Sequence, residues 1–194
     1  MGRPNLRDKI LTAGLDRLTA KGYGATSVAD IADAAGAPKG SFYNHFSSKE
    51  HLAVEALNLY LMQQEVDRLH DGTVRPLERL RGYFEFMAGQ MESKDFRHGC
   101  LMGGLAAFVD EEQPLIRQAV GAAYTDVTSA VAAVLGEARG TGALPSDSDA
   151  GELAIVILDA WEGALLRMRI EGRRRPFDAF FAVIFERLLP GLSR

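Results

Sequence analysis

The sequence contains a single cysteine, Cys100, among 194 residues, so an intramolecular disulfide is excluded. Long apolar runs are also scarce. A strongly apolar one, from Leu153 to Leu158, is ended by Asp159 and is far shorter than the roughly 20 residues that a membrane-spanning helix needs. The opening residues MGRPNLRDKI lack the apolar core of a signal peptide. These absences predict a cytoplasmic chain that does not cross a bilayer.

Sequence motifs that commonly mark enzymes are missing as well. We find no phosphate-binding loop, no nucleophile elbow, no metal-binding helix and no convincing acid–base pair. Asp95, His98 and Cys100 lie close together in the sequence, but three candidate ligands in one short segment without a second cluster are weak evidence for a metal site. We therefore predict no enzymatic activity, no cofactor and no metal. An enzyme or a small-molecule-binding helical protein without DNA binding is the alternative.

The two parts of the chain differ in charge. Residues 1–50 hold seven Lys/Arg and five Asp/Glu, whereas residues 51–194 hold fifteen Lys/Arg and twenty-one Asp/Glu. A modestly basic head on an acidic body suits DNA binding through the head alone, because the body repels the phosphate backbone. The hydrophobic content of 47% is enough for a well-buried core.

Residues 26–50, TSVADIADAAGAPKGSFYNHFSSKE, contain closely spaced signals for two short helices. Ser27 with Asp30 forms a capping box at the start of the first, and Gly36 suits a left-handed exit from it. Pro38 fits the first turn of the second helix. Ser47 with Glu50 is expected to form a second capping box, at the start of a long helix that runs to about His70. The pattern predicts a helix-turn-helix.

The second short helix is expected to expose hydrogen-bonding and small residues. Phe42 and Phe46 are four residues apart and are expected to face inward. For His45, a phosphate contact and a local structural role are both open. The alternative for the whole segment is a small helical subdomain in which Tyr43 and His45 pack and do not bind. The residues expected to face outward are Lys39, Gly40, Ser41, Tyr43, Asn44 and His45.

These residues and their spacing resemble the DNA-binding signature of TetR family transcriptional regulators. The resemblance covers about a quarter of the chain and implies a helix-turn-helix DNA-binding domain at residues 1–50 and an effector-binding and dimerisation domain at 51–194. It further implies a regulator, most simply a repressor, that leaves a palindromic operator when an effector arrives. The residues implied to bind DNA are Thr26, Ser27, Lys39, Gly40, Ser41, Tyr43, Asn44, His45 and Lys49, with Lys39 and Tyr43 on the operator and Thr26 and Lys49 mainly on phosphates.

The remaining sequence predicts an all-α fold. A helix capped by Asn5 and running to about Lys21 is expected to brace the head, and Leu77–Met91 and the segment beginning at Gln113 carry helical apolar stripes. Gly136–Asp149 is expected to be a loop whose Ser148 or Asp147 caps the next helix. Residues 150–171 are apolar almost all round, and the last helix carries an aromatic stripe. We predict that the protein is a homodimer and that these last two helices, residues 150–190, form its interface.

The segment around Cys100 resembles, more weakly, the Gly-Cys-Leu-x-Gly stretch of TetR family members that respond to electrophiles and small unsaturated acids. The resemblance implies a thiol sensor, and Arg97 and His98 could stabilise a thiolate. The alternative is a small apolar residue in a helix contact. In that case a reversible ligand is expected in an apolar cavity lined by Phe84, Met87, Met102, Phe108, Tyr124 and Trp161.

Overall fold

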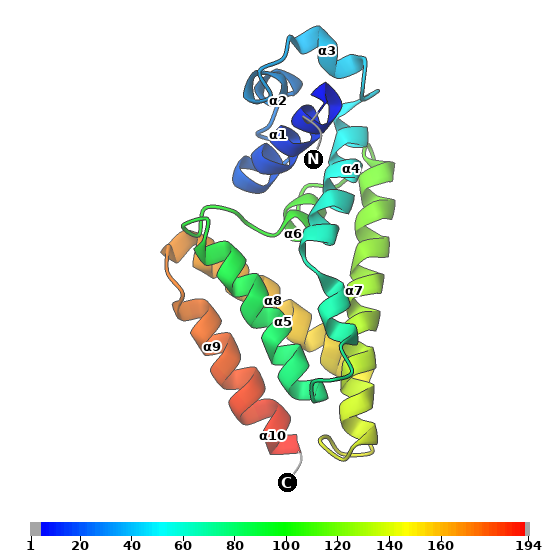
Figure 1. Cartoon of the computed structure of the whole chain (residues 1–194), viewed down its shortest axis with the longest axis vertical. Helices are drawn as coiled ribbons and strands as arrows, with labels where there is room; N and C mark the ends of the chain where they lie inside the picture. The colour runs from blue at the N-terminus through cyan, green and yellow to red at the C-terminus, as the bar shows by residue number, and fades with distance from the viewer. Residues whose placement is uncertain (1–4, 193–194) are drawn as a thin grey trace. The chain divides into compact units, whose positions relative to one another are not determined.

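The structure is a computed structural model and describes residues 5–192. Within that range the regular structure is helical, as the sequence predicts, and Figure 1 shows the helices in chain order. They are α1 (Leu6–Lys21), α2 (Val28–Ala34), α3 (Lys39–Tyr43), α4 (Lys49–Gln63), the 3₁₀ helix η1 (Val66–His70), α5 (Pro76–Glu92), α6 (Leu101–Ala106), α7 (Pro114–Gly140), α8 (Ala150–Glu171), α9 (Arg175–Val183), the π-helix η2 (Ile184–Leu188) and α10 (Leu189–Leu192).

The described residues fall into two compact units. The first, called here the DNA-facing unit because it contains the segment expected to bind DNA, comprises residues 5–63 and 100–123 and therefore contains α1 to α4, α6 and the start of α7. The second, the body, comprises residues 64–99 and 124–192. Helix α7 contributes its first ten residues to the DNA-facing unit and the rest to the body. The predicted domain boundary at residue 50 stays a prediction.

Local signals set the helix starts in the DNA-facing unit. Asn5 accepts a hydrogen bond from the Asp8 backbone N–H at 2.9 Å and caps α1. Gly22 ends α1 with φ at 86°, a conformation that favours glycine. The core of the unit is made of buried apolar side chains from its helices and from the segment after α3, and it includes Ile10, Ile31, Phe42, Phe46 and Leu52.

The long helix predicted from Ser47 to about His70 is broken after Gln63. Helix α4 ends at Gln63, and Glu65 takes a left-handed conformation with φ at 49° before η1 begins. A break here was not visible in the sequence, because Gln63, Gln64 and Glu65 include neither glycine nor proline. Non-glycine residues adopt positive φ only when surrounding structure holds them there.

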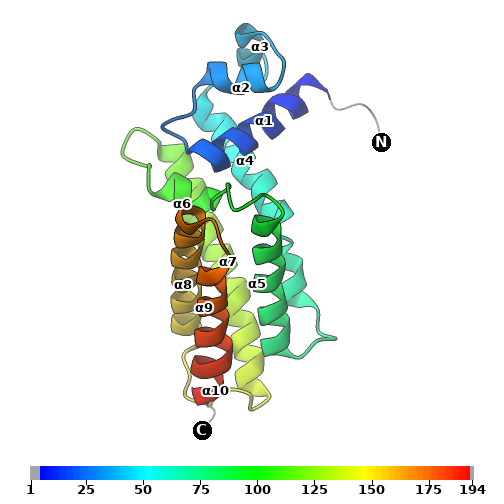
Figure 2. The same cartoon turned by 90° about the vertical axis from the view of Figure 1, so that its left-hand side faces the viewer.

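The body is built around an aromatic cluster. Trp161 of α8 stacks on Phe177 of α9 with ring centroids 4.8 Å apart, and Phe84 of α5 lies 5.1 Å from both Trp161 and Phe180. Figure 2 shows α8, α9 and α5 as neighbouring, roughly parallel rods in this unit. The predicted apolar stripe of α5 is buried in the same core.

Two predicted details at the ends of α7 and α8 need correction. Helix α7 continues through Gly136 to Gly140, so the loop before α8 is shorter than predicted. Asp149, and not Ser148 or Asp147, caps α8, because its Oδ1 accepts hydrogen bonds from the N–H groups of Gly151 and Glu152 at 2.8 and 3.0 Å. Three acceptor side chains in a row left the cap undecided from sequence.

Candidate nucleic-acid interface

Helix α3 presents polar groups to solvent and anchors itself with two aromatic rings. Phe42 and Phe46 are buried, with ring centroids 5.5 Å apart, as predicted. Tyr43 is 56% exposed although it follows directly after Phe42, so its ring and hydroxyl are available to a partner. Of the other residues predicted to face outward, Lys39, Gly40 and Asn44 are exposed and Ser41 and His45 are partly exposed.

The start of α2 is fixed by the predicted capping box. The Asp30 backbone N–H donates to Ser27 Oγ at 3.1 Å, and the Ser27 backbone N–H donates to the Asp30 carboxylate at 2.8 Å. Hydrogen bonds from the Ser27 side chain and backbone lower the pKa of Asp30. Ser27 therefore has a structural role, and its predicted DNA contact stays a prediction.

Thr26 lies inside the unit. Its side chain is 1% exposed, and its hydroxyl donates to the Gly22 carbonyl oxygen at 2.8 Å. The geometry gives no support to a phosphate contact from this hydroxyl. Thr26 has a structural role instead, because its hydroxyl holds the link between α1 and α2 against the end of α1.

Lys49, at the start of α4, also points into the protein. Its Nζ donates to the carbonyl oxygens of Tyr23 at 3.0 Å and Thr26 at 3.1 Å, and it lies 4.0 Å from the centroid of the Tyr23 ring. Burial lowers the pKa of the Lys49 ammonium group. Burial also raises the pKa of the Tyr23 hydroxyl, and the nearby Glu50 carboxylate raises it further.

The predicted capping box of Ser47 with Glu50 is wrong. The His51 backbone N–H donates to Ser48 Oγ at 3.1 Å, which makes Ser48 the cap of α4, and Ser47 Oγ is hydrogen-bonded to the His51 ring. The Glu50 carboxylate instead accepts from the N–H groups of Leu115 and Ile116, at 2.8 and 3.2 Å, in the first turn of α7. Sequence reasoning missed this role because the partners lie 65 and 66 residues away.

Three of the residues predicted to bind an effector belong to the DNA-facing unit. Cys100 is the N-cap of α6, where its Sγ accepts from the Gly103 N–H at 3.5 Å, and Met102 is buried. Phe108, after the end of α6, places its ring 5.1 Å from the ring of Tyr23. A Cβ atom at Gly24 would lie 2.5 Å from Phe108 Cε2, so the contact requires glycine there.

The other four predicted effector residues belong to the body. Phe84, Met87 and Trp161 are buried, and Phe84 and Trp161 are members of the aromatic cluster. Tyr124 is half-buried on α7. The predicted set is thus divided between the two units, and the geometry of the aromatic cluster favours a packed core. The predicted cavity stays a prediction.

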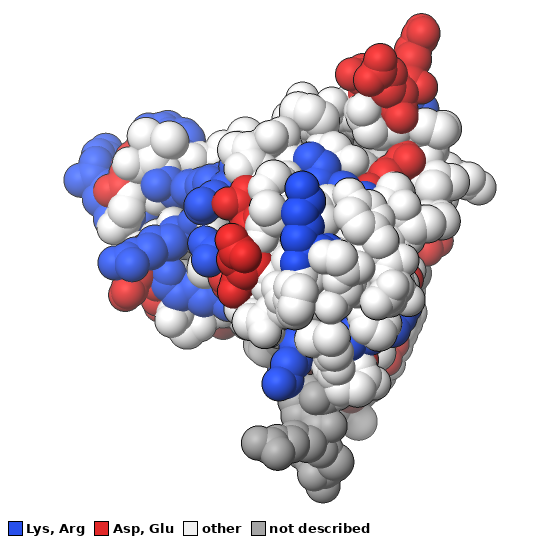
Figure 3. Space-filling model, turned by 90° about the horizontal axis from the view of Figure 1, so that it is seen from above, with Lys and Arg blue, Asp and Glu red and all other residues white. Residues whose placement is uncertain are grey.

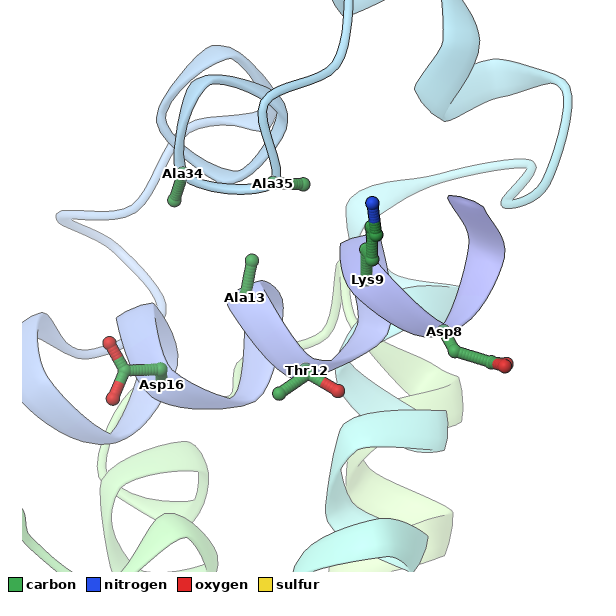
Figure 4. A pocket seen from close by; sticks show the side chains of 7 residues that line it. All are labelled: Asp8, Lys9, Thr12, Ala13, Asp16, Ala34 and Ala35. Carbon is green, nitrogen blue, oxygen red and sulfur yellow. The ribbon is translucent and has the colours of Figure 1, made fainter. Parts of the chain in front are cut away.

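A hollow of about 550 Å³ lies on the DNA-facing unit between α1 and the end of α2. Figure 4 shows Ala13 of α1 pointing towards the end of α2 that carries Ala34 and Ala35. None of the residues predicted to bind DNA lines this hollow. Its lining residues are Asp8, Lys9, Thr12, Ala13, Asp16, Ala34 and Ala35.

The basic triplet at residues 173–175 spans the turn between α8 and the start of α9. Figure 3 shows acidic side chains among the basic ones in the left part of the view. Arg173 pairs with Glu171 at 3.0 Å, and Arg174 pairs with Asp178 at 3.0 Å and with Glu92. These ion pairs agree with the interpretation of the triplet as a charged turn that needs no nucleic acid.

Two further results concern metal and membrane. Among residues 5–192, no group of three or more His, Cys, Asp and Glu side chains is arranged to hold a metal ion. Within the same range α7 is the one helix long and apolar enough to cross a membrane, a test that the core helix of a soluble protein also passes. The predictions that the chain binds no metal and does not cross a bilayer both stay predictions.

Comparison with known proteins decides the family. Residues 10–56 match the family model for bacterial regulatory proteins of the tetR family, and residues 76–184 match the model for the tetracyclin repressor-like C-terminal domain. The HTH-type transcriptional repressor DhaR of Mycobacterium sp. (strain GP1) is 34% identical over 98% of this chain and 96% of its own length. The chain belongs to the TetR family.

Other TetR family proteins resemble it over most of their length. The transcriptional regulator AcuR of Cereibacter sphaeroides is 34% identical over 88% of this chain and 80% of its own. The crystal structure of regulatory protein TetR from Rhodobacter sphaeroides is 32% identical, with a TM-score of 0.84 over 92% of this chain and 96% of that one. The reduced form of E. coli NemR, at 24% identity and a TM-score of 0.79, shares the fold.

Family membership confirms the predicted all-α architecture and the predicted function at the level of the class. The protein is a DNA-binding transcriptional regulator of the TetR family, which is a family of non-enzymatic proteins. The prediction that it is not an enzyme is confirmed on this ground. TetR family regulators bind operator DNA and small-molecule effectors, and they form dimers.

Proposed function

We propose that this TetR family protein is a cytoplasmic homodimeric repressor that reads an imperfectly palindromic operator with α3 and leaves it when an effector binds. The exposed polar face of α3, anchored by Phe42 and Phe46, is the observation that carries the proposal. A dimer with one α3 in each half-site requires an operator with two-fold symmetry. The relatives named as repressors support the direction of regulation.

The first test removes single side chains from α3. We expect Tyr43→Ala and Lys39→Ala each to weaken binding to the operator by about 1–3 kcal/mol, because each deletes a direct contact. Fluorescence anisotropy titration of an operator found by selection from genomic DNA measures the change. Lys94→Ala, an exposed lysine of the body, is the matched control and is expected to bind as wild type does. Unchanged binding by both α3 variants would refute the assignment of α3 as the reading helix.

An apolar stripe on α8 supports the proposed dimer. Ile155, Val156, Leu166 and Ile170 are exposed on this helix, at spacings that place them along one side, and Val183 of α9 is half exposed. The aromatic stripe of α9 was predicted to belong to the dimer interface. Its side chains Phe177, Phe180 and Phe181 are instead buried within the body of a single chain. The dimer surface is therefore proposed to be mainly α8.

For the effector, two possibilities remain open at Cys100. In the first, an electrophile modifies the half-buried thiol, which removes the Sγ acceptor that caps α6 and adds bulk beside it. Because α6 leads into Phe108, whose ring lies on Tyr23, the change would reach the link between α1 and α2. In the second, Cys100 is a small capping and packing residue, and a reversible ligand releases the operator.

The Cys100→Ser variant separates these possibilities. Serine is a good N-cap, so the variant retains the cap of α6 and loses the nucleophile. If Cys100 is the sensor, N-ethylmaleimide is expected to release wild-type protein from the operator and to leave Cys100→Ser bound. Labelling is unambiguous because no other cysteine exists. Equal release of both proteins, or release of neither, would assign Cys100 to packing.

A further inference from the structure

Lys49 is surrounded by acceptors from its own chain. Its Nζ donates to two backbone carbonyl oxygens, of Tyr23 and Thr26, and the face of the Tyr23 ring lies 4.0 Å away. An ammonium group has three N–H donors, and two carbonyls with one aromatic face are enough to satisfy them. The side chain is also half-buried, and this burial lowers the pKa of the ammonium group. A free lysine ammonium is strongly hydrated, whereas that of Lys49 is bound to groups of its own chain.

The two carbonyls that Lys49 holds belong to the link between α1 and α2. This link begins at Gly22, with φ at 86°, and ends at Ser27, which caps α2. Thr26 ties the link to the end of α1 through its hydroxyl. Lys49 adds the connection to α4, so that the start of α2 is held from two helices. Because α2 leads through the turn at Gly36 into α3, the position of the reading helix depends on this attachment.

We propose that Lys49 is a positioning residue for DNA recognition and not a phosphate ligand. It acts through the Tyr23 and Thr26 carbonyls, which fix the start of α2 and thereby α3. The inference rests on the proposed function, in which α3 reads DNA. It replaces the expectation, implied by the resemblance, that Lys49 contacts mainly phosphates.

The salt dependence of operator binding distinguishes the two roles. A lost phosphate contact lowers the slope of log K against log salt concentration by about one for each protomer. For Lys49→Met we expect roughly tenfold weaker operator binding, the effect of losing hydrogen bonds from a charged donor, with the slope unchanged. A slope reduced by about one per protomer would overturn the proposal, as would wild-type affinity.

A measurement without DNA separates this inference from the proposed function. In hydrogen–deuterium exchange of the free protein, Lys49→Met is expected to speed exchange of the amides in residues 22–28 and to leave α8 unchanged. Unaltered exchange in residues 22–28 would overturn the inference even if wild-type protein bound no operator. Failure of wild-type protein to bind an operator would refute the proposed function and leave this inference standing.

Lys49→Arg covers the case in which Lys49→Met does not fold. Arginine retains the charge, but its planar fork does not place donors on the two carbonyls and the ring as the ammonium does. We expect faster exchange in residues 22–28 and weaker operator binding for this variant too. A phosphate ligand predicts the opposite, near wild-type affinity and exchange, and that outcome would overturn the proposal.

Discussion

The double variant Leu166→Glu, Ile170→Glu is expected to be a folded monomer that has lost most of its affinity for the operator. Leu166 and Ile170 are 61% and 87% exposed on α8, which is unusual for large apolar residues. Burying one such side chain contributes about 1.5–3 kcal/mol, and two-fold symmetry repeats each contribution in a dimer. Four carboxylates introduced into that surface would repel one another. A monomer contacts one half-site, so we expect operator binding to fall by on the order of 10²-fold or more.

Sedimentation velocity and anisotropy titration of the same samples test this prediction. Met62→Glu is the matched control, because Met62 is 77% exposed on α4 and is not part of the α8 stripe, so its replacement should leave a dimer. Phe181→Glu is a poor probe of the interface, since Phe181 is buried within the body and a charge there would unfold the chain. A Leu166→Glu, Ile170→Glu protein that still sediments as a dimer would place the interface elsewhere.

Phe84→Ala is expected to lower the free energy of unfolding by about 3–5 kcal/mol, the range found for large aromatic residues in packed cores. Phe84 is fully buried, and its ring lies 5.1 Å from Trp161, 5.1 Å from Phe180 and 6.2 Å from Phe185. The truncation would leave a space that three neighbouring aromatic rings cannot fill without leaving their own contacts. A residue that lines an effector cavity would cost less, because one side of it already faces empty volume.

Chemical denaturation followed by Trp161 fluorescence, with circular dichroism as a second probe, measures this difference. Phe86→Ala provides the control on the same helix: its ring is only half-buried, beneath the Arg68 guanidinium at 4.1 Å, and its loss should cost clearly less. If Phe84→Ala proved as stable as Phe86→Ala, the aromatic cluster would be a cavity wall and the predicted effector site in the body would regain support.

Predictions from local sequence were the most accurate. The caps at Asn5 and Ser27 were predicted correctly, because an N-cap acts over three residues and its partners are adjacent in the chain. The inward pair Phe42 and Phe46 follows from spacing in the same way. The break after Gln63 could not be predicted, since local propensity favours helix there and only tertiary packing holds Glu65 in a left-handed conformation.

In the candidate site too, features set by nearby residues could be predicted and those set by distant segments could not. Exposure of Tyr43 and Lys39 follows from a short amphipathic helix, whereas the partners of Lys49 and Glu50 depend on segments 23 to 66 residues away. A carboxylate in the first turn of a helix fits its own helix dipole as well as it fits the first turn of α7. The set Phe84, Met87 and Trp161 illustrates another limit: a packed aromatic core and a cavity wall have the same composition, and only coordinates tell them apart.

The division of α7 between the two units has a mechanical meaning. The chain crosses between units after Gln63, after Gly99 and within α7 after Ala123. The first two crossings lie in irregular backbone, which absorbs torque by rotating a few dihedral angles, whereas a hydrogen-bonded helix resists twisting. Of the three crossings in the described residues, the one in α7 is therefore the one where the backbone is a continuous hydrogen-bonded helix. Gly121 lies within one turn of this crossing, and glycine is the residue with the greatest backbone freedom. We therefore expect α7 to bend most easily where it passes from one unit to the other.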